Sequence, residues 1–290
     1  MVAPPALSSD DFAYISRLLK ENSGLIVTPD KAYLINTRLK PIVERNGLAT
    51  VSALVRQMKS GRLLSLKDEV VDAMTTNESL FFRDSKPFQA LIEMMLPTLC
   101  ERGRTRPIRV WCAAASTGQE PYSIAMMLED NARLFGGRDI SIFATDLSQA
   151  ALRRARMGEY TAFEVGRGMP ADVLQRHFTK TESGHYVVSP KVRARVSFRA
   201  RNLLEPFDSM GNFDIIFCRN VLIYFDRPTK ADVLNRMAKL LPPEGYLVLG
   251  GPETTLGLSD AFVRHPTWRN IYTKADKPDS AAKVRDGAYA

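Results

Sequence analysis

A turn of small residues in the middle of the chain leads directly to a carboxylate. Residues Ala113 to Gly118 are alanine, serine, threonine or glycine, and Glu120 follows. Small side chains let backbone N–H groups approach a ligand, as in nucleotide-binding turns. Glu120 would repel a pyrophosphate but suits an ammonium group or ribose hydroxyls. Neither G-x-G-x-x-G nor the Gly-Lys-Ser/Thr of a P-loop occurs here, which disfavours dinucleotides and ATP. The alternative is an ordinary buried turn.

A second acid, Asp146, ends the apolar stretch 139–146, which we predict to be a strand. A carboxylate at the end of the second strand of a doubly wound sheet is placed to accept both ribose hydroxyls. The alternative role is the N-cap of a helix predicted over 148–157, because Asp is a favoured cap. The two roles are compatible in one loop, and we favour ribose binding.

The elements that must position these acids alternate between strands and helices. Apolar runs predict five buried strands, and the segments between several of them have helical spacing. A terminal hairpin over 262–273 would add an antiparallel edge. The fold class predicted is therefore α/β, with a doubly wound sheet. The predicted strands are 108–112, 139–146, 196–200, 213–218 and 246–250.

The first quarter of the chain has a different pattern. Capped amphipathic helices are predicted over 9–24, 28–47, 50–61 and 65–74, which together make a small all-helical domain. Lys31, Arg38 and Arg45 recur every seven residues, so they lie near one face of the second helix. This stripe is either a docking face for an acidic helix or a solvated charged surface.

Three motifs identify a family. The stretch 111–125, the loop 75–84 and the segment 217–225 closely resemble the chemotaxis receptor methyltransferase (CheR) family, and the resemblance runs from about Ser8 to Lys274. It implies a protein-glutamate O-methyltransferase that uses S-adenosylmethionine, releases S-adenosylhomocysteine and needs no metal. It also implies a Rossmann-like methyltransferase sheet, an N-terminal helical domain that docks on the receptor, and a small antiparallel β-subdomain.

The resemblance also assigns site residues. Arg83 and Tyr224 are predicted to be catalytic, with Arg83 near the reaction centre and Tyr224 near the transferred methyl group. The predicted cofactor-binding residues are Asn77, Ser79, Arg83, Ala113, Glu120, Asp146, Asn202, Leu203, Arg219 and Asn220. From the residues alone, Arg83 would be a surface salt-bridge residue, Asn202 a turn residue and Tyr224 a core aromatic.

The predicted division of the chain has three parts. A helical domain covers 1–75, a methyltransferase domain covers 76–276, and a disordered tail covers 277–290. Within the second part, strands at 184–188 and 191–193 are predicted to form a β-subdomain over about 178–194. Some family members bind a receptor's C-terminal pentapeptide there. The loop 179–184 is shorter than in those versions, so we do not predict that tether here.

Composition narrows the class of protein. The net charge is +8, which favours an acidic partner such as nucleic acid, an anionic membrane surface or an acidic protein. No stretch approaches the roughly 20 apolar residues of a membrane span, and the first residues do not resemble a signal peptide, so we predict a cytoplasmic protein. Three cysteines and scattered histidines suggest neither a disulfide scaffold nor a metal site. With the resemblance, the predicted partner is the set of cytoplasmic chemoreceptor helices, without nucleic acid or membrane insertion.

The predicted reaction is methyl transfer to a glutamate γ-carboxylate. A glutamate pKa near 4.3 leaves that group ionised at neutral pH, so no general base is required. One rival is a nucleic-acid methyltransferase, although 219–222 lacks the Asp/Asn-Pro-Pro-aromatic turn of amino-nitrogen methylation. The other rival is a non-catalytic module that binds the cofactor and signals by docking.

Overall fold

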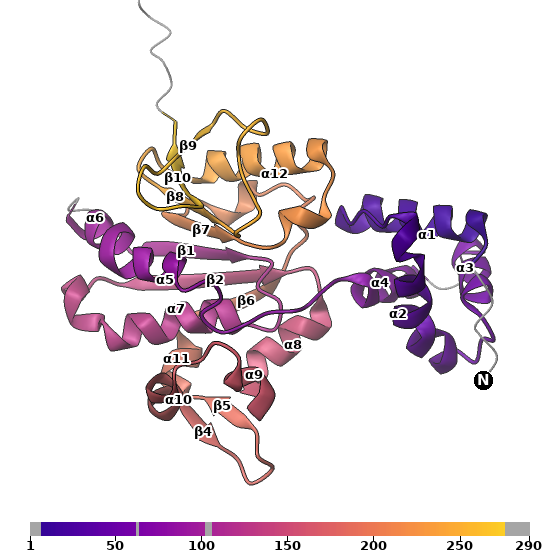
Figure 1. Ribbon diagram of the computed structural model, residues 1–290, viewed down its shortest axis with the longest axis horizontal. Coiled ribbons are helices and arrows are strands. Elements are labelled where there is room, and N and C mark those ends of the chain that lie inside the picture. The colour runs from indigo at the N-terminus through magenta and orange to yellow at the C-terminus, as the bar shows by residue number, and fades with distance from the viewer. Residues whose placement is uncertain (1–6, 62–63, 102–105, 276–290) are drawn as a thin grey trace, which may run out of the picture.

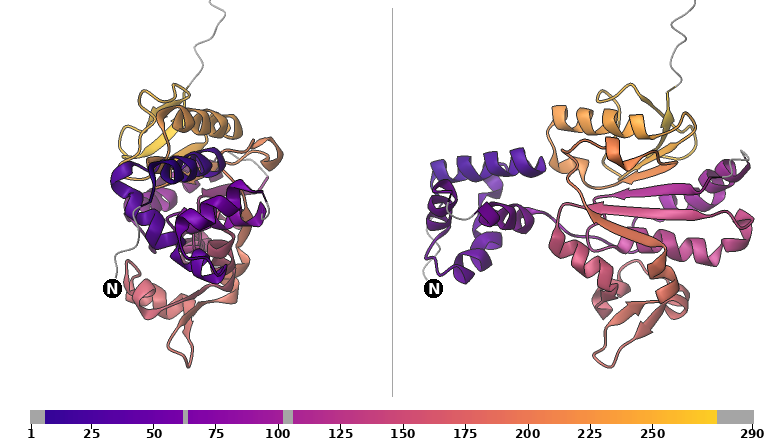
Figure 2. Two further views of the ribbon diagram at one scale, coloured as in Figure 1. Left: turned by 90° about the vertical axis from the view of Figure 1, so that its right-hand side faces the viewer. Right: turned by 180° about the vertical axis from the view of Figure 1, so that it is seen from behind.

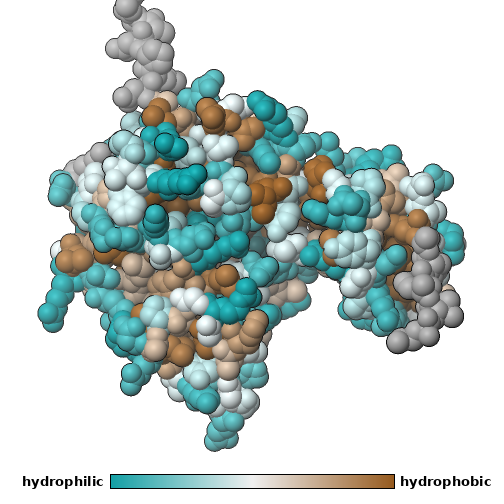
Figure 3. All heavy atoms as spheres, viewed as in Figure 1, coloured by the Kyte–Doolittle hydropathy of each residue, from teal (hydrophilic) through white to brown (hydrophobic). Residues whose placement is uncertain are grey.

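The computed structural model of the chain describes residues 7–61, 64–101 and 106–275, and these form two parts of unequal size. A small bundle of N-terminal helices stands beside a large α/β part, and a single extended segment joins them (Figures 1 and 2). In the space-filling view the bundle is a separate lobe, and hydrophobic side chains on that face occur in scattered patches among hydrophilic ones (Figure 3).

The N-terminal helices have caps and a core of their own. Ser8 and Thr50 accept hydrogen bonds from the N–H groups of Asp11 and Ala53, and Gly24 ends the first helix with φ of 74°. The bundle encloses a buried cluster that includes Ile15 and Leu39. The all-helical domain was therefore predicted correctly. Its helices are α1 (Ser9–Ser23), α2 (Ala32–Arg45), α3 (Val51–Lys59) and α4 (Leu64–Met74), with a 3-10 turn, η1 (Pro29–Lys31), before α2.

The basic stripe on α2 is partly used within the domain itself. The Arg38 guanidinium donates to the carbonyl oxygens of Met74 and Thr75, at 2.5 and 3.1 Å, and to Thr76 Oγ1 at 3.0 Å. Arg45 forms an ion pair of 2.6 Å with Glu69 on α4. Two of the three stripe cations thus bind α2 to α4 and to the segment after it. The docking face for an acidic helix stays a prediction, and these internal contacts of Arg38 and Arg45 do not test it.

The large part is built on a seven-stranded sheet with the order β6-β2-β1-β7-β8-β10-β9. Neighbouring strands from β6 to β8 run parallel, whereas β10 is antiparallel to both β8 and β9. The predicted doubly wound fold and its antiparallel terminal hairpin are confirmed. The strands are β1 (Ile108–Ala113), β2 (Ile140–Asp146), β6 (Val196–Ala200), β7 (Ile215–Cys218), β8 (Tyr246–Leu249), β9 (Phe262–Arg264) and β10 (Ile271–Lys274).

Helices cover both faces of this sheet, and alternate strand residues point into two cores. Val110 and Cys112 of β1 join a cluster with the helices that precede and follow that strand, whereas Trp111 joins a cluster with the helix before β8. The covering helices are α5 (Lys86–Ala90), a π-helical turn η2 (Leu91–Met95), α6 (Leu96–Glu101), α7 (Gln119–Asp130), α8 (Gln149–Met157) and α12 (Arg227–Leu240). The 3-10 turns are η3 (Ala132–Phe135), η4 (Asp208–Met210) and η5 (Leu222–Tyr224).

A three-stranded antiparallel sheet projects from the large part between β2 and β6 (Figure 1). The strand predicted over 191–193 is wrong, because Ser189 caps a helix there and Pro190 occupies its first position. The sheet also begins earlier than 178, at β3. Its elements are β3 (Glu159–Tyr160), α9 (Ala162–Gly166), α10 (Ala171–His177), β4 (Phe178–Lys180), β5 (Tyr186–Val188) and α11 (Pro190–Ala194).

Some predictions concern residues that the structure does not describe. The tail 277–290 and most of the polar connection 101–105 lie outside the described residues. Within the described ranges, every helix is too short or too polar to cross a membrane. The same ranges hold no group of three or more His, Cys, Asp and Glu side chains that could bind a metal ion. The three cysteines are free thiols.

Candidate functional site

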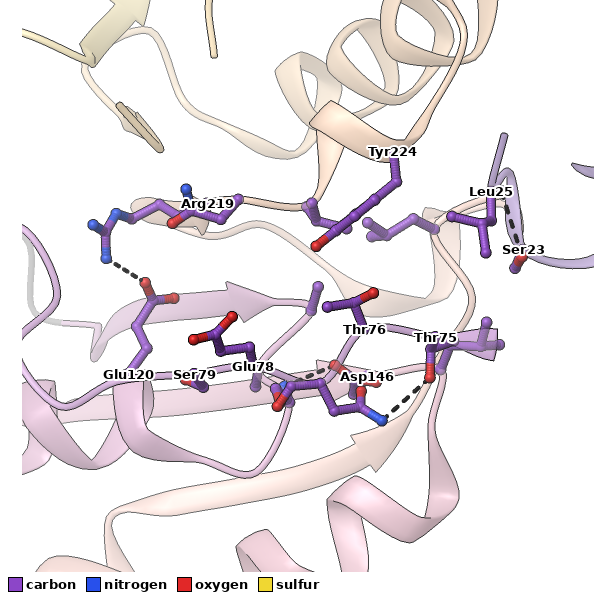
Figure 4. Close-up of a pocket in the computed structure, with 18 of the residues that line it drawn as sticks. Ser23, Leu25, Thr75, Thr76, Glu78, Ser79, Glu120, Asp146, Arg219 and Tyr224 are labelled. Carbon is purple, nitrogen blue, oxygen red and sulfur yellow. Dashed lines mark hydrogen bonds and ion pairs between the residues drawn. The ribbon is translucent and has the colours of Figure 1, made fainter. Parts of the chain in front are cut away.

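A cavity opens at the carboxyl ends of β1, β2 and β7, on the side that faces the helical domain (Figure 4). Its empty volume is about 1000 Å³, a value that includes space open to solvent. Ser23, the last residue of α1, and Leu25, just after that helix, form part of its wall. The structure brings together these predicted site residues: Asn77, Ser79, Arg83, Glu120, Asp146, Asn202, Leu203, Arg219, Asn220 and Tyr224.

Ala113 is the predicted residue that does not line the cavity. It is the last residue of β1, is 1% exposed and belongs to the core on the α12 side of the sheet. The three residues after it, Ala114 to Ser116, line the cavity instead. Ala114 and Ser116 have φ of 60° and 52°, left-handed conformations that residues other than glycine adopt at some cost. This turn geometry could not be read from a run of alanines.

Asp146 holds the turn and also faces the cavity. Its Oδ2 accepts the Ser116 N–H at 2.7 Å, and its Oδ1 accepts the Ser148 N–H at 2.8 Å. Burial raises the pKa of its carboxyl group. The N-cap of α8 is Ser148, whose hydroxyl accepts the Ala151 N–H, so Asp146 as the cap was wrong. Each carboxylate oxygen keeps lone-pair capacity for a ligand hydroxyl.

Glu120 is paired with a residue of its own chain. Its Oε2 lies 2.8 Å from Arg219 Nη1, and the Arg219 side chain is only 2% exposed. Arg219 also forms a 2.9 Å ion pair with Asp84 and donates to the Arg83 carbonyl oxygen at 2.8 Å. Burial raises the pKa of Glu120, and the charge of Arg219 opposes that rise. Glu120 Oε1 makes no hydrogen bond to any described residue, so it stays available to a cation in the cavity.

The Arg83 guanidinium makes no hydrogen bond or ion pair with any residue in the described part of the chain, although it lines the cavity. The alternative prediction, a surface salt bridge, is therefore not observed. Its loop is held firmly, because the Phe82 N–H donates to Ser123 Oγ at 3.0 Å and Ser116 Oγ donates to the Asn77 carbonyl oxygen at 2.8 Å. A guanidinium left free on a cavity wall suits a carboxylate ligand.

The helical domain completes the wall near Tyr224. Asn202 accepts the Leu204 N–H at 3.0 Å, which is the predicted turn role, and its side-chain amide also donates to the Asn22 carbonyl oxygen at 2.6 Å. The Tyr224 carbonyl oxygen accepts the Ile26 N–H at 3.0 Å. The Tyr224 side chain is half-buried and extends toward the part of the cavity lined by Glu120 and Asp146 (Figure 4). It is not a core aromatic.

Sequence reasoning missed two contributions to this site. The first is the wall supplied by the end of α1, whose pattern indicates only a capped amphipathic helix. The second is Glu253, a buried carboxylate that binds the backbone at Asn220. The only local signal for it is an acid between Pro252 and Thr254, in a stretch that reads as a loop.

Comparisons with known proteins agree on one family. The profile described as "CheR methyltransferase, all-alpha domain" matches residues 10–75, and "CheR methyltransferase, SAM binding domain" matches 77–269. Chemotaxis protein methyltransferase 1 of Pseudomonas aeruginosa is 41% identical over 255 residues, covering 87% of this chain and 93% of that protein. The Vibrio parahaemolyticus chemotaxis protein methyltransferase is 42% identical (88% and 93% covered), and the Salmonella typhimurium one is 35% identical (89% and 88%).

Proposed function

Because the chain belongs to the CheR family of chemotaxis methyltransferases, and is thus an S-adenosylmethionine-dependent protein-glutamate methyltransferase, we propose that it methylates glutamates in the cytoplasmic helices of chemoreceptors. One observation carries the assignment of the site. The free guanidinium of Arg83 and the ring of Tyr224 line one cavity, between the sheet and the helical domain. A receptor helix bound along that domain would present a glutamate to them. The site of action is therefore the cytoplasm.

The hydrogen-bond acceptors in the cavity fit the cofactor. Asp146 has acceptor capacity left for the two ribose hydroxyls, and Glu120 Oε1 has none of its own partners and suits an ammonium group. Asn202 and Leu203 also line the cavity and are assigned to the adenine, and Asn77 and Ser79 of the loop 75–84 line it as well. When bound, S-adenosylmethionine supplies an electrophilic methyl group on a sulfonium.

Methyl transfer requires that the accepting carboxylate be aligned, and it does not require a general base. The receptor carboxylate is ionised at neutral pH, and none of the described residues that line the cavity is a histidine. An oxygen of the receptor carboxylate forms a bond to the methyl carbon, in line with the carbon–sulfur bond. The carbon–sulfur bond breaks, and its electron pair stays on sulfur. Arg83 holds the carboxylate and Tyr224 orients its attacking oxygen. An anion and a cation are both neutralised, so partial exclusion of water assists the step.

The test is methyl transfer to purified receptor signalling fragments. We expect radiolabel from S-adenosylmethionine to appear on the fragment and to be released by alkali, as a carboxyl methyl ester must be. Arg83→Ala and Tyr224→Phe should lower the rate at least tenfold, which is a loss of about 1.4 kcal/mol of transition-state stabilisation. Lys86→Ala and Tyr14→Phe are matched controls, since the first is an exposed cation three residues away and the second is a tyrosine in the helical domain.

Two results would contradict the proposal. Alkali-stable label would mean that the methyl acceptor is not a carboxylate. Unchanged rates for both site variants would move the reaction away from this part of the cavity. S-adenosylhomocysteine affinity, measured by calorimetry on each variant, separates a lost cofactor contact from a lost substrate contact.

A further inference from the structure

Glu253 lies behind the cavity wall, in the loop between β8 and β9, and is 6% exposed. Its Oε2 accepts the N–H groups of Asn220 at 2.8 Å and Gly250 at 2.7 Å. Its Oε1 accepts the N–H groups of Val221 at 3.0 Å and Leu222 at 2.8 Å. A carboxylate offers about four acceptor sites, so backbone N–H groups fill all of them. No cation forms an ion pair with it in the part of the chain described.

The peptide that Glu253 holds has an unusual backbone. Asn220 has φ of 58°, a conformation that non-glycine residues adopt at some cost. Three successive N–H groups, from Asn220 to Leu222, converge on one carboxylate as a result. Arg219 directly precedes this turn, and Tyr224 ends the 3-10 turn that follows it. The turn therefore sets where both side chains enter the cavity.

The fit around the carboxylate is close. A Cβ added to Gly250 would lie 2.7 Å from Asn220 Nδ2, 2.8 Å from Asn220 N and 2.8 Å from Glu253 Oε2. Two of these atoms belong to the turn, and the third belongs to the carboxylate that holds it. Glycine at 250 is thus required for the carboxylate to reach the turn, which gives an independent way to disturb the same contact.

We propose that Glu253 is a positioning residue for methyl transfer: its carboxylate fixes the Asn220–Leu222 turn so that Tyr224 faces the methyl acceptor. Glu253 does not line the cavity, so it acts through the turn and touches neither cofactor nor substrate. The inference rests on the proposed role of Tyr224. It adds a residue that supports that role from outside the cavity.

The first experiment measures catalysis in Glu253→Gln and Gly250→Ala. Glutamine keeps the shape but replaces one oxygen with an NH₂ group, which faces two N–H donors and accepts neither. We expect kcat to fall about tenfold to a hundredfold in both variants, since a displacement of about 1 Å has effects of that size. Asp260→Asn is the control, because it removes the same charge from an exposed position in the same loop.

A double-mutant cycle with Tyr224→Phe tests whether the effect passes through the turn. We expect the fold reduction in kcat caused by Glu253→Gln to be at least threefold smaller in the Tyr224→Phe background than in the native chain. The rates are measured at saturating cofactor and well below the melting temperature of each variant. Equal costs in both backgrounds would mean a general structural role and would overturn the proposal. So would a Glu253→Gln variant with kcat within twofold of the native value.

Amide hydrogen exchange gives a readout that does not depend on activity. Peptides that cover 219–224 should exchange faster in Glu253→Gln and Gly250→Ala, and at the native rate in Asp260→Asn. Unchanged exchange in the first two variants would overturn the proposal directly. If the native chain formed no methyl ester at all, the proposed function would fail, while the exchange experiment would still decide whether Glu253 fixes the turn.

Discussion

Replacement of Arg219 by methionine should destabilise the methyltransferase domain more than any other single change at the cavity. Arg219 is nearly fully buried and makes three polar contacts through its two terminal nitrogens. Methionine fills a similar volume but leaves Glu120 buried beside the cavity without its cation. Because burial already raises the pKa of Glu120 and Arg219 opposes that rise, the pKa should increase further in the variant.

The size of this destabilisation follows from how buried each partner of Arg219 is. Removal of one partner from a buried ion pair typically costs about 3–5 kcal/mol, because the remaining charge is left unpaired. The contact with Asp84 adds about 1 kcal/mol or less, since that side chain is 54% exposed. We therefore expect a total loss of about 3–6 kcal/mol in the free energy of unfolding. Most of that loss should disappear when Glu120 is also neutralised.

The assay is denaturant unfolding of Arg219→Met, Glu120→Gln and the double variant, followed by tryptophan fluorescence. Trp111 and Trp268 are the two tryptophans of the chain and both lie in the methyltransferase domain, so the signal reports that domain. In the double-mutant cycle we expect a coupling energy of at least about 2 kcal/mol. A cost below about 1 kcal/mol for Arg219→Met, or strictly additive costs, would refute the argument that the pair is buried and interdependent.

Three further changes test other contacts of the same framework. Gly168→Ala should destabilise the fold by more than about 1 kcal/mol, because φ is +88° and the new Cβ would lie 2.3 Å from the Phe81 carbonyl oxygen. Gly136→Ala is the control, since Gly136 also has a positive φ but open space around it. In thermal melts of both variants, Gly136→Ala should cost less stability. The ion pair with Lys20 on α1 and the hydrogen bonds by which Asp226 caps α12 lower the pKa of Asp226. The ionised carboxylate therefore stabilises the fold fully at a pH above the unfolded-state pKa near 3.9, and this stabilisation is lost as the pH falls below that value. The difference in melting temperature between native chain and Asp226→Asn should therefore shrink as pH falls from about 6 to about 3. Arg38→Met should weaken S-adenosylhomocysteine binding by about tenfold in calorimetry, because Arg38 holds linker residues that line the cavity; unchanged affinity would contradict this.

The sheet was predictable from the sequence because its signals are local. Buried parallel strands give continuous apolar runs. Asp146 ends one such run, and Glu120 follows the turn of small residues after another. The strand predicted over 191–193 failed because the preceding Ser189-Pro190 pair starts a helix, with Ser189 as the cap and Pro190 in the first position. The pairing of β3 with β5 joins residues 159–160 to 186–187, and two residues carry no period that could reveal it.

The sequence predicted which residues line the cavity better than it predicted the contacts that those residues make. The pattern placed Glu120 at the start of a helix, but its ion pair spans 99 residues of sequence, and no local pattern encodes such a distance. The same holds for the Glu253 carboxylate and its turn, and for the hydrogen bond from Ile26 to Tyr224. These contacts depend on which loops the topology brings to one edge of the sheet.

The distribution of charge around the cavity favours a reaction between two opposite charges. Glu120 is balanced by Arg219, and Glu78 by Arg167, so Arg83 and Asp146 are the lining charges without an ion pair among the described residues. A transition state in which an anion and a cation neutralise each other gains least from strong fixed charges, because such charges stabilise the reactants more. One half-buried guanidinium can align a carboxylate while water still screens it. A pair as enclosed as Glu120 with Arg219 would hold the reactant carboxylate too tightly, which is why we assign alignment to Arg83 and scaffolding to Arg219.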